Sequence, residues 1–123
     1  MSDKKIFVDS NVFLYLLESE SEKKDQASKI LLSRPLISPQ VIFENINVAM
    51  KKFGLSKADA LQHGEKLLHE CVLFLDTESS VRKALELIRK DFIQVYDSRI
   101  VASALEAGCD VLHSEDFQHL RIF

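Results

Sequence analysis

Residues 5–9 read Lys-Ile-Phe-Val-Asp, a short apolar run that ends in an acidic residue. The β-branched and aromatic side chains of this run predict a buried strand. An acid directly after a buried strand is unusual, because burying a charge without a partner costs free energy. The plainer interpretation is that Asp9 caps a helix or a turn. Asp116 follows the run 110–114 in a similar way and predicts a second strand that leads to an acid.

Two further strands are predicted, at 35–38 and at 71–75, and the second is an unbroken apolar run expected to be buried on both faces. The helices between the strands begin at favourable residues. Asn11 is the expected cap of a helix over 12–17, and Ser38-Pro39 supplies the cap and first residue of another. Strands that alternate with helices indicate an α/β fold in which helices cover both faces of a parallel sheet.

Length and composition fit one ordinary globular domain over residues 1–123. The chain is 46% hydrophobic and 28% charged, with a net charge of −3, which argues only weakly against a nucleic-acid partner. No apolar run is long enough for a membrane span, and the first residues lack the apolar stretch of a signal peptide. Two cysteines far apart in the sequence indicate reduced thiols, so we expect a cytoplasmic protein.

Four acids are candidates for a common site. Asp9 and Asp116 follow strands, and ligands of parallel sheets bind at the carboxyl ends of the strands. Glu44 and Asp97 lie in or next to predicted helices, where a solvated glutamate and a helix cap are the plainer interpretations. Crowded carboxylates repel each other, and a divalent cation is the usual means of stabilising them. Convergence of the four would indicate a metal site and phosphoryl-transfer chemistry.

Four short motifs carry a resemblance to a known family. They are Phe7-Val8-Asp9-Ser10-Asn11, Glu44 in a helix begun by Pro39, Tyr96-Asp97-Ser98 before an alanine-rich helix, and Ser114-Glu115-Asp116 after a strand. In this order they resemble the PIN domain, and most of all the toxin ribonucleases of toxin–antitoxin pairs called VapC. The resemblance implies a three-layer α/β/α sandwich with a central parallel sheet of four to five strands. Family members often continue past the equivalent of Phe123 into another edge strand, so we expect a shortened sheet edge.

The resemblance also implies a metal-dependent endoribonuclease. Asp9, Glu44 and Asp97 would be the core catalytic and metal-binding acids and Asp116 the fourth, with Asn11 and Ser114 in support. Mg²⁺ or Mn²⁺ would activate a water molecule, so hydrolysis would leave a 5′-phosphate. Near the acids in the sequence, three basic residues are candidates for contact with RNA phosphates: Lys51, Lys52 and Arg99.

The expected partners are RNA, a small antitoxin protein and a second copy of the chain. Candidate contacts of such a homodimer are Phe13, Tyr15 and Leu16, although each is more simply a core residue. A receiver domain of a signalling relay stays open as an alternative, because Asp76 follows the third predicted strand. So does an inactive PIN-like module that binds RNA or protein. Zinc is not expected, since the four histidines and two cysteines lack ligand spacing.

Overall fold

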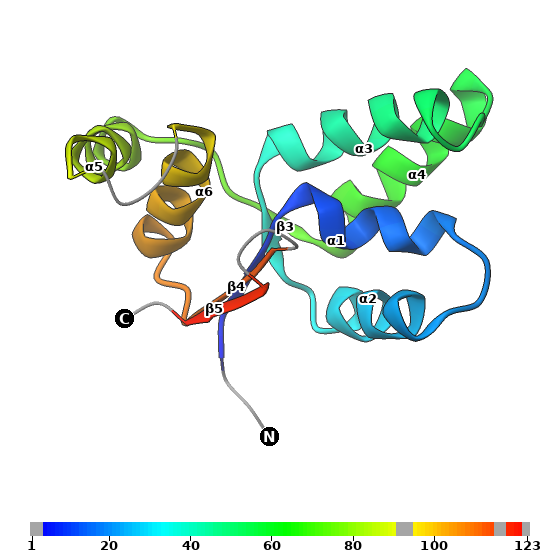
Figure 1. Ribbon diagram of the computed structural model, residues 1–123, viewed down its shortest axis with the longest axis horizontal. Coiled ribbons are helices and arrows are strands. Elements are labelled where there is room, and N and C mark those ends of the chain that lie inside the picture. The colour runs from blue at the N-terminus through cyan, green and yellow to red at the C-terminus, as the bar shows by residue number, and fades with distance from the viewer. Residues whose placement is uncertain (1–3, 91–94, 115–117, 122–123) are drawn as a thin grey trace.

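The computed structural model describes residues 4–90, 95–114 and 118–121, and at 95–97 and 118–121 it describes the backbone alone. A central sheet separates two groups of helices (Figure 1). The strands are β1 (Ile6–Val8), β2 (Leu36–Ile37), β3 (Val72–Leu73), β4 (Val111–Ser114) and β5 (Gln118–Arg121). The helices are α1 (Ser10–Leu14), the 3₁₀ helix η1 (Tyr15–Leu17), α2 (Glu22–Leu32), α3 (Pro39–Lys51), α4 (Lys57–Glu70), α5 (Glu78–Arg89) and α6 (Val95–Glu106).

Within the described residues the sheet has five strands in the order β3-β2-β1-β4-β5. The first four run parallel, and β5 pairs antiparallel with β4 through registers such as Leu112 with Leu120. The predicted α/β sandwich is therefore confirmed. β5 is not predicted from the sequence, where a shortened sheet edge is expected; it adds an antiparallel edge strand to the four parallel ones. No helix in the described part of the chain has the length and apolar character needed to cross a membrane.

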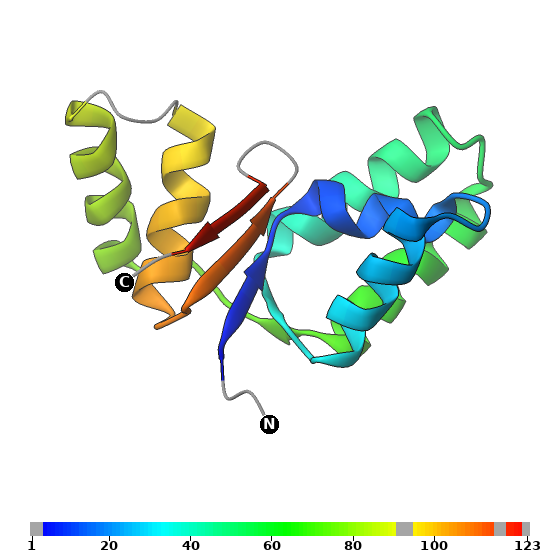
Figure 2. The same ribbon diagram turned by 60° about the horizontal axis from the view of Figure 1, so that its bottom comes forward.

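Alternation along the strands builds a separate core on each face of the sheet. Val8 and Ile37 point toward α1 to α4 and join a buried cluster with Phe13, which is fully buried. Phe7 and Leu112 point to the opposite face, where they pack against α6. Figure 2 shows the two helical layers on either side of the strands. Since side chains of a strand alternate between faces, a three-residue strand can serve both cores.

Two local predictions are wrong. The first helix starts one residue after Asp9, whose carboxylate accepts a hydrogen bond from the Ser10 backbone N–H, so Asp9 rather than Asn11 is the cap. The third strand is two residues long and exposed at the sheet edge, although the apolar run 71–75 predicts a strand buried on both faces. An edge strand needs few apolar contacts, so the apolar run overstates its length and its burial.

Helices α3 and α4 approach closely where α4 carries Gly64. A Cβ atom at this position would lie 2.6 Å from Ile46 Cδ1 and Cγ1, closer than side-chain atoms can pack. One residue earlier on α3, the fully buried Asn45 side chain accepts a hydrogen bond from His63 Nε2 at 2.9 Å. The Asn45 amide nitrogen donates to the carbonyls of Val41 and Ser10. Asn45 therefore joins α4 to the start of α1.

His63 predicts a pH-dependent stability. Burial, and next the positive charge of Lys66, lower the pKa of His63 below its ordinary value of 6.5. The unfolded chain then binds the proton more tightly, so the free energy of unfolding should fall as the pH drops below about 6.5. Urea unfolding between pH 8 and 5 measures this.

His63→Gln retains a donor for Asn45 but cannot be protonated, so it should remove that component of the pH dependence. His69→Gln, at an exposed position on the same helix, should leave it intact. An unchanged pH dependence in His63→Gln would show that His63 is not its source.

Candidate functional site

Asp9 is fixed at the carboxyl end of β1 by contacts to β4 and α1. Its backbone N–H donates to the His113 carbonyl at 2.9 Å, which extends the parallel ladder by one residue. Its Oδ1 accepts from the Ser10 N–H at 2.7 Å, and its Oδ2 accepts from the Ser114 hydroxyl at 3.0 Å. Ser114 is buried, so this hydroxyl is held beside Asp9. The structure thus places Ser114, a predicted supporting residue, in hydrogen-bond contact with Asp9.

Glu44 reaches the same place from α3. The buried Ser10 hydroxyl donates to Glu44 Oε2 and lies 3.5 Å from Asp9 Oδ1. One hydroxyl group thus stands between two carboxylates that are far apart in the sequence. Ser10 is held in place by Asn45, whose amide donates to the Ser10 carbonyl at 3.1 Å. Asp9 and Glu44 are both half-buried.

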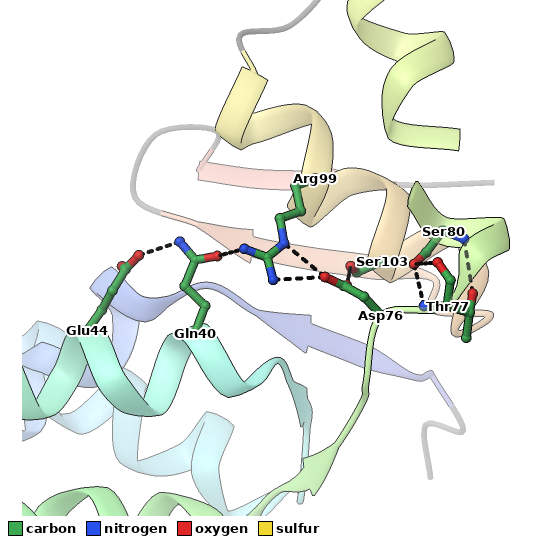
Figure 3. A network of polar contacts seen from close by, with 7 residues as sticks. All are labelled: Gln40, Glu44, Asp76, Thr77, Ser80, Arg99 and Ser103. Carbon is green, nitrogen blue, oxygen red and sulfur yellow. Dashed lines mark hydrogen bonds and ion pairs between the residues drawn. The ribbon is translucent and has the colours of Figure 1, made fainter. Parts of the chain in front are cut away.

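From Glu44 a chain of polar contacts continues to the other helical layer (Figure 3). Gln40, one turn before Glu44, donates to Glu44 Oε1. Its Oε1 accepts from Arg99 Nη1 of α6 at 2.7 Å, and the Arg99 guanidinium is paired with Asp76. The contacts therefore run across the carboxyl edge of the sheet, from α3 to the loop after β3.

The other candidate residues are placed less fully. The backbone of Asp97 lies in the first turn of α6, which begins at the same end of the sheet as the carboxyl ends of β1 and β4 (Figure 2). The side chain of Asp97 and the whole of Asp116 lie outside the described residues. Asn11 lies in the first turn of α1, with its Oδ1 3.5 Å from the Ser10 hydroxyl. Lys51 and Lys52 are exposed at the end of α3, about 10 Å from Glu44 along the helix axis.

The described donors suit a hard divalent cation. They are carboxylate and hydroxyl oxygens, which Mg²⁺ and Mn²⁺ prefer, and each carboxylate oxygen can accept more than one contact. Among the side chains that the structure describes, no three His, Cys, Asp or Glu residues are close enough to hold a metal ion. Asp9 and Glu44 would thus need the acids of α6 and of the segment after β4 to complete a ligand set.

Sequence reasoning missed Ser10, Gln40 and Asn45. Ser10 was visible only as part of a motif, and its hydroxyl contact to Glu44 depends on how α1 packs against α3. Gln40 lies four residues before Glu44, a spacing that places two side chains on one helix face and could have drawn attention to it. Asn45 lies in an apolar stripe of α3, and an amide among apolar residues is the sequence signal that could have drawn attention to it. In the structure it is fully buried, and buried amides are normally hydrogen-bonded.

Residues 6–122 match the sequence pattern of the PIN domain family. The chain belongs to this family. No curated protein shows significant sequence similarity to it. Among solved structures, Mycobacterium tuberculosis VapC20, a toxin that cleaves the sarcin-ricin loop, is 15% identical, with a TM-score of 0.68 and 92% of each chain covered.

Two structures of toxin–antitoxin assemblies share the PIN fold. A complex from Klebsiella pneumoniae is 17% identical, with a TM-score of 0.69, and covers 92% of this chain and 90% of its own. DNA-bound VapBC from Salmonella typhimurium is 22% identical, with a TM-score of 0.64 and coverages of 89% and 83%. The family match over residues 6–122 confirms the resemblance seen in the motifs, and PIN domains form a nuclease family.

Proposed function

We propose that this chain is a single PIN nuclease domain, residues 1–123, that hydrolyses RNA with Mg²⁺ or Mn²⁺ and acts as the toxin of a toxin–antitoxin pair. The observation that carries the proposal is the junction of Asp9 and Glu44 through Ser10 at the carboxyl edge of the sheet. In the proposed site Asp9, Glu44, Asp97 and Asp116 supply the metal-binding carboxylates. Asn11 and Ser114 support Asp9 and its surroundings.

The chain's own residues would contribute mainly by fixing charge in place. The Ser10 N–H and the Ser114 hydroxyl hold the two oxygens of Asp9, while Ser10 and Gln40 hold those of Glu44. Carboxylates held in this way need little rearrangement when charge develops on the phosphate. A bound Mg²⁺ or Mn²⁺ would supply an activated water and offset that charge. Lys51 and Lys52 are the proposed contacts to RNA phosphates farther along α3.

The partners and the cellular location are proposals of the same kind. The similarity to structures crystallised as toxin–antitoxin complexes supports an antitoxin partner, and the family supports a homodimer. Phe13 is fully buried in the core, so it is a poor candidate for a dimer contact, whereas Leu16 is partly buried and packs against the same core. Both cysteines are free and buried, and burial raises the pKa of Cys71 to about 12 and of Cys109 to about 11. Inert reduced thiols fit the proposed cytoplasmic location.

Metal binding should raise the thermal stability of the protein. A ligand that binds only the folded state stabilises it by about 2.7 kcal/mol at 100 times its dissociation constant. Thermal unfolding across a series of Mn²⁺ concentrations measures this, with Glu44→Gln as the variant expected to lose the increase. Equal melting temperatures at all concentrations would mean that the acids do not form a metal site.

The ends of the RNA products test the reaction. Attack by a metal-activated water predicts a 5′-phosphate and a 3′-hydroxyl, which end-labelling with and without prior dephosphorylation identifies. Products with 2′,3′-cyclic phosphates would rule out this mechanism, because they arise when the RNA 2′-hydroxyl is the nucleophile.

A further inference from the structure

A further acid, Asp76, lies at the carboxyl edge of the sheet and is not among the four proposed metal ligands. Asp76 follows β3 and is paired with Arg99 of α6. Asp76 Oδ2 is 3.0 Å from Arg99 Nε and 2.8 Å from Nη2, and its Oδ1 accepts from the Ser103 hydroxyl at 3.0 Å. Both carboxylate oxygens are therefore held by groups one turn apart on α6. In a receiver domain the acid at this position must be free to accept a phosphoryl group, so the pairing of Asp76 with Arg99 and Ser103 argues against that alternative.

The backbone after Asp76 is also fixed. Thr77 caps α5 and forms a reciprocal capping box with Ser80, whose side chain is buried. Figure 3 shows this box directly beside the Asp76–Arg99 pair. Asp76 is thus placed by α5 on one side and by α6 on the other.

Arg99 in turn sets the orientation of the Gln40 amide. Arg99 has donors only, so the Gln40 atom 2.7 Å from its Nη1 is the oxygen. The Gln40 nitrogen then points along α3 and donates to Glu44 Oε1. A reversed amide would place an N–H against the guanidinium and a carbonyl oxygen against the carboxylate. The pairing with Asp76 keeps Arg99 at the position where it selects the productive amide orientation.

The Asp76–Arg99 pair contributes little to folding by itself. The Arg99 side chain is 48% exposed and that of Asp76 25% exposed. Exposed ion pairs of this kind stabilise proteins by about 0–1 kcal/mol. The positional effect is more consequential, because hydrogen-bond partners behind metal ligands commonly change metal affinity or activity by about 10–100-fold.

We propose that Asp76, Arg99 and Gln40 form a positioning relay that orients the Glu44 carboxylate toward the metal. The relay rests on the proposed function, since it gives Glu44 a metal to bind. The relay connects the two helical layers by hydrogen bonds, because Asp76 and Arg99 lie on the side of α5 and α6 and Gln40 lies on α3. None of the three residues needs to touch the metal or the RNA.

The alternative, a direct contact between Arg99 and RNA, predicts a different result for the substitution Asp76→Ala. If Arg99 binds a phosphate, Asp76 competes with the RNA, and Asp76→Ala should lower KM for RNA by freeing the guanidinium. If the relay operates, Asp76→Ala should weaken Mn²⁺ binding about 10-fold and lower kcat with KM for RNA unchanged. Asp76→Asn should retain part of the Mn²⁺ affinity and part of kcat, since its amide oxygen can accept from Arg99 while its nitrogen donates to Ser103.

The experiment measures Mn²⁺ binding by calorimetry and RNA cleavage kinetics for the wild-type protein, Asp76→Ala and Asp76→Asn. Glu78→Ala is the matched control, because it removes the Glu78–Arg82 pair, an exposed arginine–carboxylate pair on α5 with a distance of 2.8 Å. The control should behave as the wild type. Melting temperatures of all four proteins show whether a loss comes from unfolding. Normal Mn²⁺ affinity in Asp76→Ala, or a lower KM for RNA, would overturn the relay.

A metal-free measurement separates failure of the relay from failure of the proposed function. In ¹⁵N-labelled protein without metal, the side-chain amide signals of Gln40 should shift in Asp76→Ala and stay in place in Glu78→Ala. A wild-type protein that binds no Mn²⁺ would contradict the proposed function, and the Gln40 signals would still test the relay. Unshifted Gln40 signals in Asp76→Ala would refute it with or without metal binding.

Discussion

Asp9→Asn is expected to lower kcat/KM for RNA cleavage by at least about 100-fold while the protein stays folded. The fold should persist because asparagine caps helices as well as aspartate does and can still accept from the Ser10 N–H. Metal binding needs the negative charge, and a neutral amide removes it. Cleavage rates at saturating Mn²⁺, together with a melting curve, measure both effects.

Asp110→Asn is the matched control for this substitution. Asp110 lies at the amino end of β4, where its Oδ2 accepts from the Lys5 backbone N–H at 3.0 Å, and thus at the opposite edge of the sheet from Asp9. It should leave cleavage unchanged. Full activity in Asp9→Asn, or an equal loss in Asp110→Asn, would remove Asp9 from the proposed site.

Asn45→Ala is expected to lower the free energy of unfolding by about 2–4 kcal/mol and the melting temperature by roughly 10 °C. The Asn45 side chain is fully buried and bonds to Ser10, Val41 and His63. Alanine would leave the Ser10 carbonyl and the His63 ring without this partner inside the protein. Urea unfolding at pH 8 measures the loss with His63 neutral.

Asn47→Ala tests whether this loss is specific to the buried amide. Asn47 is exposed two residues farther along α3 and should change stability by less than about 0.5 kcal/mol. Similar stability in both variants would show that the Asn45 network contributes nothing net. Because Asn45 also holds Ser10, its loss should reduce activity as well, through Glu44.

The fold was predictable where local chemistry and tertiary packing agree. The apolar run before Asp9 fixes a strand that ends at the site, and Ser38-Pro39 starts α3 at Pro39 as its sequence predicts. Prediction failed where neighbouring elements decide. Asp9 and Asn11 are both good caps. The backbone hydrogen bond from Asp9 to His113 extends the strand pairing as far as Asp9, so the helix starts at Ser10 rather than at Val12. β5 forms by pairing with β4, and the sequence of β5 alone does not indicate a strand.

The site shows the same division. Asp9 and Glu44 were predictable as site residues, since the end of a buried strand and an apolar helix flank are unfavourable environments for a charge. Their connection through Ser10 depends on the packing of α1 against α3. Arg99 was predicted to contact RNA because it lies two residues after Asp97, whereas its pairing with Asp76 and Gln40 depends on contacts 23 and 59 residues away in sequence.

The proposed function requires that this PIN domain cleaves RNA with a metal held by its acids. Cleavage of a mixed RNA pool in the presence of Mn²⁺, run beside Asp97→Asn prepared identically, tests it most directly. We expect cleavage by the wild-type protein and none by the variant, because Asp97 lies at the start of α6 beside the edge where Asp9 and Glu44 meet. Equal cleavage by both proteins would contradict it.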